Sequence, residues 1–113
     1  AAEAWFRLGN TKEAKKYIDE IRNRACNYEG IMTPVEETDI DDDFILDERA
    51  RELVGEHTRW MDLKRFRRLK ERAEAHNPYI TSFDENVHYL RPIPDSAELD
   101  YHENPGNFQN PGY

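Results

Sequence analysis

The sequence predicts a mainly α protein, with a helical hairpin, further helices and an irregular, loop-rich C-terminal segment. Three observations support this fold class. Apolar residues recur at helical spacing within residues 1–27 and 41–77. Glycines, asparagines and aspartates interrupt the periodicity where helices would begin and end. Beyond Pro78 the periodicity is lost and Asn-Pro pairs recur, so loops are expected there.

Residues 1–27 are expected to form a hairpin of two antiparallel helices, with the turn at Gly9 and Asn10. The small residues and the Leu-Gly-Asn turn stand in an order that resembles a tetratricopeptide-type repeat, of which one copy is present. Because a single repeat cannot bury its apolar face alone, it requires neighbouring helices. The apolar stripe of the second helix consists of Ala14, Tyr17, Ile18 and Ile21.

Residues 27–40 contain a glycine and a proline and have no sustained period, so a loop is expected there. The aspartates at 41–43 follow, where their carboxylates can cap the first turn of a helix. They lack the spacing and the closing glutamate of a calcium-binding loop. A pair of helices is then predicted within residues 41–77, divided near Gly55.

Both helices of this pair carry an apolar stripe. The first stripe ends at His57, for which a partly buried packing or hydrogen-bonding role is predicted. The second begins at Trp60, so we expect this indole in the core and expect its replacement by alanine to cost about 3–5 kcal/mol. The stripe residues are Leu46, Ala50, Leu53, Val54 and His57, then Trp60, Leu63, Phe66, Leu69 or Lys70, and Ala73.

Residues 78–113 form the predicted irregular tail. The run from Val87 to Leu90 is expected to be extended, and the prolines of residues 91–94 make that stretch stiff and non-helical. The last residues are expected to lie over the helices, held there by Phe108 and Tyr113.

The composition favours a single folded region, residues 1–113. With 37% apolar and 35% charged residues the chain is polar, but 12% aromatic residues are too many for a disordered chain. A lone cysteine, Cys26, excludes an internal disulfide. There is no apolar run of the roughly 20 residues that a membrane helix needs. The chain begins in mid-helix without methionine, so we expect Ala1 not to be the natural start and any targeting signal to lie upstream.

The net charge of −8 argues against a nucleic-acid or anionic-membrane binder as a whole. The charge is unevenly distributed, with acids and no base in residues 36–48 and many bases in residues 59–72. On a helix those bases spread around the axis and form no single stripe. We therefore expect them to pair with the acids of 36–48 or to be solvated.

No catalytic, metal or cofactor site is predicted. Glu48, Glu52 and Glu56 share one helix face, but arginines alternate with them and favour ion pairs over a catalytic carboxylate pair. The histidines lack metal-ligand spacing. Loop aromatics can stack on the apolar faces of sugar rings. The candidate ligand-binding residues are therefore Tyr28, Tyr79 and Tyr101.

Three segments together resemble the C-terminal part of the SusD/RagB family of glycan-binding outer-membrane lipoproteins. They are AEAWFRLGNTKEAKKYIDEIRNRA, FILDERARELVGEHTRWMDLKRF, and HYLRPIPDSAEL with the terminal NPGNFQNPGY. The resemblance implies a mostly helical protein with tetratricopeptide-like hairpins, held at the cell surface by a lipidated cysteine that this chain does not contain. It implies binding of an oligosaccharide, delivery to a TonB-dependent transporter of the SusC type, and no catalytic residues or cofactors.

Two other functions remain open from the residues alone. A freestanding helical repeat module for protein interaction would expose contact residues on its hairpin and bind no glycan. A helical glycoside-processing enzyme would need two carboxylates in a pocket, one of them protonated near neutral pH.

Overall fold

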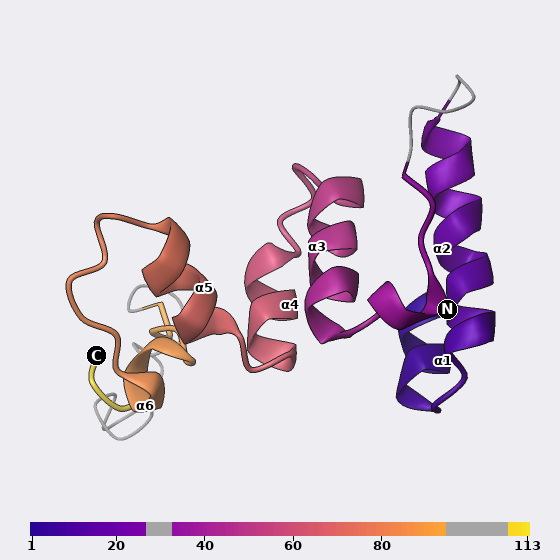
Figure 1. Cartoon of the computed structure of the whole chain (residues 1–113). Helices are drawn as coiled ribbons and strands as arrows, with labels where there is room; N and C mark the ends of the chain where they lie inside the picture. The colour runs from indigo at the N-terminus through magenta and orange to yellow at the C-terminus, as the bar shows by residue number, and fades with distance from the viewer. Residues whose placement is uncertain (27–32, 95–108) are drawn as a thin grey trace. The chain divides into compact units, whose positions relative to one another are not determined.

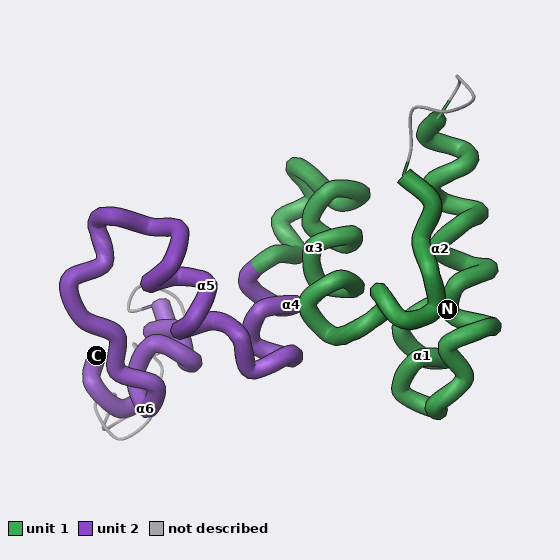
Figure 2. The backbone as a smooth tube through the Cα atoms, viewed as in Figure 1, with its two compact units in different colours: residues 1–59 green, residues 60–113 purple. Residues whose placement is uncertain are grey.

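The computed structural model describes residues 1–26, 33–94 and 109–113. These residues form six α-helices and one 3₁₀ helix, and none of them is in a strand, which confirms the predicted mainly α class (Figure 1). The chain divides into two units, residues 1–59 and residues 60–113 (Figure 2). Whether the whole chain acts as one domain stays a prediction.

Unit 1 begins with the predicted helical hairpin. Helix α1 spans Ala2–Arg7 and packs against α2, which spans Thr11–Ala25 (Figure 1). On α2, Ala14 and Ile18 are buried as the periodicity predicts. Tyr17, on the same predicted stripe, is 36% exposed. The stripe therefore turns its small and aliphatic members inward and leaves the tyrosine at its edge.

The turn of the hairpin has a defined hydrogen-bond pattern. The amide of Gly9 donates to the carbonyl of Phe6 (2.9 Å), and the amide of Asn10 donates to the carbonyl of Trp5 (2.9 Å). This pair of bonds is a Schellman motif, which needs the left-handed backbone that Gly9 adopts at φ +77°. Asn10 then caps α2, because its side-chain oxygen accepts from the amide of Glu13 (3.0 Å).

The segment before the next helix contributes to the core of unit 1. It contains a 3₁₀ helix, η1, at Glu37–Asp39, and the amide of Glu36 donates to the carboxylate of Asp39 (2.9 Å). Val35 and Ile40 flank η1 and are buried. The described part of the predicted loop thus contains a turn of 3₁₀ helix with a buried apolar side chain on either side of it.

Helix α3 spans Asp42–Glu52 and begins where the aspartate run predicts. Asp41 is its N-cap, and its carboxylate accepts from the amide of Phe44 (2.7 Å), which confirms the capping role. Ile45 and Leu46 are the buried residues of this helix.

The predicted extension of the α3 stripe is wrong at its end. Val54 is 80% exposed and His57 is exposed, so neither packs in the core. The reason is a turn over residues 53–56, in which the amide of Glu56 donates to the carbonyl of Leu53 (3.1 Å) and Gly55 has φ +84°. Helical periodicity does not continue through such a turn, and Gly55 ends the helix region as predicted.

The second helix of the predicted pair is two helices. Helix α4 spans Arg59–Arg65 and α5 spans Leu69–His76. The expectation of one continuous helix is therefore wrong. Apolar spacing continues through the break, so periodicity alone does not reveal it.

A Schellman motif makes this break without a glycine. The amide of Arg67 donates to the carbonyl of Lys64 (3.0 Å), and the amide of Arg68 donates to the carbonyl of Leu63 (2.9 Å). Arg67 has φ +58°, the left-handed conformation that glycine usually supplies at this position. Arg67 is therefore a strained residue.

We predict that Arg67→Gly raises the free energy of unfolding by about 0.5–1 kcal/mol, because glycine adopts this backbone without strain. The urea midpoint of the native protein measures the change. The matched control is Arg68→Gly, since Arg68 has an ordinary φ of −107° and gains nothing from glycine. A lower midpoint for Arg67→Gly than for the parent would contradict the strain.

Trp60 is not in the core, so the predicted cavity on its removal is wrong. Its side chain is partly exposed, and the buried apolar residues of unit 2 are Phe66 and Leu69 within the described ranges. The Nζ atom of Lys64 and the Cζ atom of Arg91 each lie 4.1 Å from its ring centroid. Two cation–π contacts thus replace the apolar packing that the stripe predicts.

The predicted extended run from Val87 to Leu90 is wrong, because helix α6 spans Glu85–His88 and Tyr89 has helical backbone angles. Asp84 caps the helix, because its carboxylate accepts from the amide of Asn86 (2.9 Å). A local capping group therefore outweighs the weak β propensity of the residues that follow.

The terminal pentapeptide, residues 109–113, is hydrogen-bonded to the stretch before the second undescribed range. The side-chain amide of Gln109 accepts from the amide of Ile93 (2.8 Å) and donates to its carbonyl (2.9 Å). Asn110 donates to the carbonyl of Arg91 (2.6 Å), and the hydroxyl of Tyr113 donates to the carbonyl of Leu90 (3.2 Å). The predicted role of Tyr113 as an anchor agrees with this bond, whereas Phe108 lies outside the described residues.

Candidate functional site

The tyrosines named from the sequence do not define a site in the structure. Tyr79 is 89% exposed and stands in a turn after α5, where its amide donates to the side chain of Asn77 (3.0 Å). It lines neither of the two clefts described below. Tyr28 and Tyr101 lie outside the described residues.

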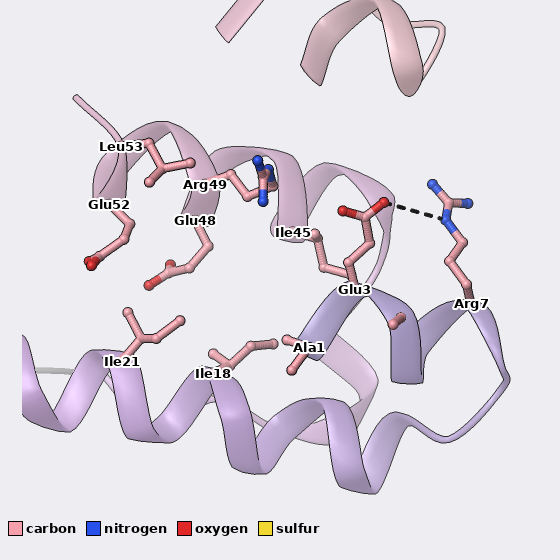
Figure 3. Close-up of a pocket in the computed structure, with 12 residues that line it drawn as sticks. Ala1, Glu3, Arg7, Ile18, Ile21, Ile45, Glu48, Arg49, Glu52 and Leu53 are labelled. Carbon is pink, nitrogen blue, oxygen red and sulfur yellow. Dashed lines mark ion pairs between the residues drawn. The ribbon is translucent and has the colours of Figure 1, made fainter. Parts of the chain in front are cut away.

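The first cleft, the hairpin cleft, lies in unit 1 between α1, α2 and α3 and has a volume of about 430 Å³ (Figure 3). Ile18 and Ile21 point into it from α2, and Ile45 and Leu53 line it from α3 and its C-terminal cap (Figure 3). Its surface is mainly apolar, with charged groups at its margin. An apolar hollow of this kind is suited to packing and offers few hydrogen bonds to a polar ligand.

The carboxylates of the hairpin cleft are held by arginines. Glu48 pairs with Arg51 (2.5 Å) and with Arg22 (3.7 Å), and Glu52 pairs with Arg24. The ion-paired interpretation is thus confirmed for Glu48 and Glu52. The prediction that Glu56 shares their helix face is wrong, because α3 ends at Glu52. Two of the partners come from α2, which helix spacing within α3 does not reveal. A glycosidase-type pair needs two carboxyls that face a common substrate, whereas both of these carboxylates are engaged by arginines.

The acid-rich residues 36–48 also form ion pairs with arginines from other parts of unit 1. Arg7 pairs with Asp42 (2.9 Å), and Arg59 pairs with Asp47 (3.8 Å) while donating to the carbonyl of Leu46 (2.7 Å). Of the expected pairing between the acids of 36–48 and the bases of 59–72, the described residues thus contain the Arg59 contact.

The pKa of one side chain in unit 1, Lys15, is shifted. The ammonium of Lys15 donates to the carboxylate of Asp19 (2.5 Å), and this bond raises the pKa of Lys15 above its ordinary value. Lys15 lines neither cleft, so this shift has no bearing on ligand chemistry there.

The second cleft, the basic cleft, lies in unit 2 and has a volume of about 630 Å³. That volume is within the range of about 300–1,000 Å³ that small-molecule sites occupy. The residues come from α4, from the turn that ends it and from the segment after α6. They are Met61, Lys64, Arg65, Arg67, Tyr89 and Leu90.

Tyr89, the aromatic residue of the basic cleft, packs against a second aromatic ring. The ring of Phe83 meets Tyr89 edge to face, with 6.1 Å between centroids and 86° between planes. The Cζ atom of Arg67 lies 5.7 Å from the ring centroid of Tyr89. Tyr89 therefore has a supported position beside a cation.

The cations of the basic cleft differ in their partners. Arg65 pairs with the buried carboxylate of Asp62 (3.0 Å). Lys64 and Arg67 instead contact the rings of Trp60 and Tyr89. No carboxylate residue is among the described residues that line the cleft, so its surface is cationic and aromatic.

Reasoning from the sequence missed the basic cleft. A continuous helix would distribute Lys64, Arg65 and Arg67 around its axis, but the break at Arg67 brings all three to one cleft. The usual signal for such a break is a glycine, and none is present in this segment.

The described ranges offer neither a metal site nor a membrane-spanning helix. They contain no cluster of three or more His, Cys, Asp or Glu side chains placed to hold a metal ion. Among the helices that they form, none is both long and apolar enough to cross a bilayer.

Comparisons with known proteins give a family match along the whole chain. The model of the SusD family matches residues 1–113. A curated relative, "SusD-like protein P2" of Formosa agariphila, is 36% identical over an alignment of 125 residues. That alignment covers all of this chain but 23% of the relative, so the chain spans about a quarter of that protein's length. No solved structure matches the chain.

Proposed function

This chain belongs to the SusD family, and from that premise we propose that it serves glycan capture at the bacterial cell surface. The observation that carries the proposal is the family match across all 113 residues. Family membership supports a general role in nutrient uptake through glycan binding. The terminal QNPGY segment and the LRPIP stretch, on which the resemblance rests, are bonded to each other in unit 2.

The geometry of unit 2 supports sugar binding. Sugars offer apolar C–H faces, which stack on aromatic rings, and hydroxyls, which accept and donate hydrogen bonds. The basic cleft presents the ring of Tyr89 next to the donors of Lys64 and Arg67. Exposed Tyr79 offers a further ring at the surface of the same unit.

In the proposed mechanism the protein captures an oligosaccharide and passes it on without breaking or forming a covalent bond. The protein holds an oligosaccharide at the outer membrane through a lipid anchor that lies outside these residues, and delivers it to a TonB-dependent transporter of the SusC type. We propose that it is not an enzyme, since the family consists of binding proteins and the carboxylates of Glu48 and Glu52 are engaged in ion pairs with arginines. It needs no cofactor in this role.

We predict that the native gene product carrying these residues binds oligosaccharides and releases no reducing sugar from them. Affinity electrophoresis in gels that contain different glycans measures the binding, and a reducing-sugar assay measures hydrolysis. Isolation of the protein from outer-membrane fractions should recover a TonB-dependent transporter with it.

Two results would contradict this function. Reducing sugar released in proportion to protein would support an enzyme. Failure to bind any glycan, together with stable capture of a soluble protein, would support a freestanding helical interaction module.

A further inference from the structure

We propose that the basic cleft selects oligosaccharides that carry carboxylate or sulfate groups, so that the captured glycan is anionic. The inference rests on the proposed function and names its substrate class. It follows from the residues that line the cleft, their partners and the backbone of one of them.

Two cations of the cleft are available to an anion. The contacts of Lys64 and Arg67 are with aromatic rings, at 4.1 Å from the Trp60 centroid and 5.7 Å from the Tyr89 centroid. A carboxylate or sulfate can accept hydrogen bonds from an ammonium or guanidinium while the ring contact persists. Arg65 is different, because Asp62 already neutralises it.

The apolar part of the cleft favours a sugar over a free inorganic anion. Tyr89, Met61 and Leu90 line the cleft beside the cations. A small ion would use the cations and leave these apolar surfaces in water. An acidic pyranose places its C–H face on the tyrosine ring and its charged group on the cations, and so uses both surfaces.

The backbone of Arg67 supports a role for its side chain. Glycine at this position would make the same hydrogen bonds without strain, as Gly9 does at the end of α1. Arginine at φ +58° carries a conformational cost. Strained residues are concentrated at binding sites, where the side chain compensates for that cost.

The negative net charge of the chain limits where an anion can be attracted. The chain has a net charge of −8 and repels polyanions at long range. Attraction to the cations of the basic cleft acts over about a Debye length, ~10 Å at 0.1 M salt. Binding should weaken as salt is added.

The test compares three oligosaccharides of equal length: one neutral, one that carries uronic acids and one that carries sulfate esters. Calorimetric titration of the native gene product at low and high salt measures each affinity. We expect the acidic oligosaccharides to bind about tenfold more tightly than the neutral one at low salt, and to lose that advantage at high salt.

A double variant tests the cleft itself. Lys64→Gln with Arg67→Asn removes both available cations, and asparagine tolerates the left-handed backbone at 67. The control, Lys12→Gln with Lys16→Gln, removes the same charge from exposed positions of α2. We expect the cleft variant to lose about tenfold in affinity for acidic oligosaccharides with an unchanged urea midpoint, and the control to lose little.

The outcomes separate the two proposals. Equal binding of neutral and acidic oligosaccharides, unaffected by the cleft variant, overturns the anionic preference and leaves glycan capture in place. Equal losses in the cleft variant and the control also overturn it, because net charge then explains the effect. If the same titration shows that single-stranded nucleic acid binds as tightly as the acidic oligosaccharides, the assignment of an acidic glycan as the ligand is overturned. Absence of binding to all three oligosaccharides overturns both proposals.

Discussion

Replacement of Gly112 by alanine is expected to destabilise the docking of the terminal pentapeptide by about 2–4 kcal/mol, from steric overlap and backbone strain together. A Cβ atom at this position would lie 2.6 Å from Cγ2 and 2.9 Å from Cγ1 of Val87. Gly112 also has φ +89°, a conformation that alanine resists. It is the third residue of a turn over residues 110–113, in which the amide of Tyr113 donates to the carbonyl of Asn110 (3.3 Å). Proline at the second position and glycine at the third are typical of a type II turn.

Two measurements report this loss. Urea unfolding gives the free energy, and amide hydrogen exchange at Ile93 reports docking, because this amide donates to the side chain of Gln109. Exchange at Ile93 should accelerate in Gly112→Ala.

The matched control for Gly112→Ala is Gly55→Ala. Gly55 has a similar φ of +84°, but nothing lies within 4 Å of its would-be Cβ atom. The free energy of unfolding of Gly55→Ala should fall only by the cost of backbone strain, about 1 kcal/mol. The additional change Val87→Ala should recover part of the loss in Gly112→Ala. Equal losses for the two glycine variants would show that contact with Val87 contributes nothing.

Replacement of Asp62 by alanine is expected to destabilise the native protein by about 2–3 kcal/mol, because it removes a buried carboxylate that accepts a charge-assisted hydrogen bond from Arg65. Asp62 is 5% exposed, and its carboxylate lies 3.0 Å from the guanidinium of Arg65. Loss of the carboxylate removes the acceptor of this bond from Arg65, whose side chain is 46% exposed. The urea midpoint and its slope measure the change.

The control for Asp62→Ala is Glu71→Ala. Glu71 pairs with Arg68 at the same helix spacing (2.7 Å), but its side chain is 57% exposed. Because water screens that pair, its loss should cost less than about 1 kcal/mol. If both variants lose the same free energy of unfolding, burial of Asp62 does not increase the contribution of its ion pair to stability.

Local signals in the sequence predicted the helices of unit 1 well. The turn at Gly9, the cap at Asp41 and the buried Ala14 and Ile18 depend on neighbours within about one helical turn. The same kind of signal failed beyond α3. Val54 continues the apolar spacing, yet it is exposed because the turn around Gly55 comes first.

The candidate site could not be derived from local signals. The lysine and arginines of the basic cleft come together only because the helix breaks at Arg67, and the Tyr89 ring beside Arg67 comes from the segment after α6. The named candidate Tyr79 is exposed outside the cleft, while Tyr89, which was expected in an extended run, lines it. Stacking and charge pairing between segments depend on the packed fold.

The sequence by itself determined the mainly α class, the hairpin, the caps and the family, since periodicity, capping and characteristic segments are properties of neighbouring residues. Only the tertiary structure decided which arginines meet Glu48 and Glu52, that Trp60 lies between cations and not in the core, and that Gly112 must lack a side chain. Each of these depends on residues distant in the chain, such as Arg24 with Glu52 or Val87 with Gly112. Such pairs form when packing brings segments together, and no short-range pattern encodes them.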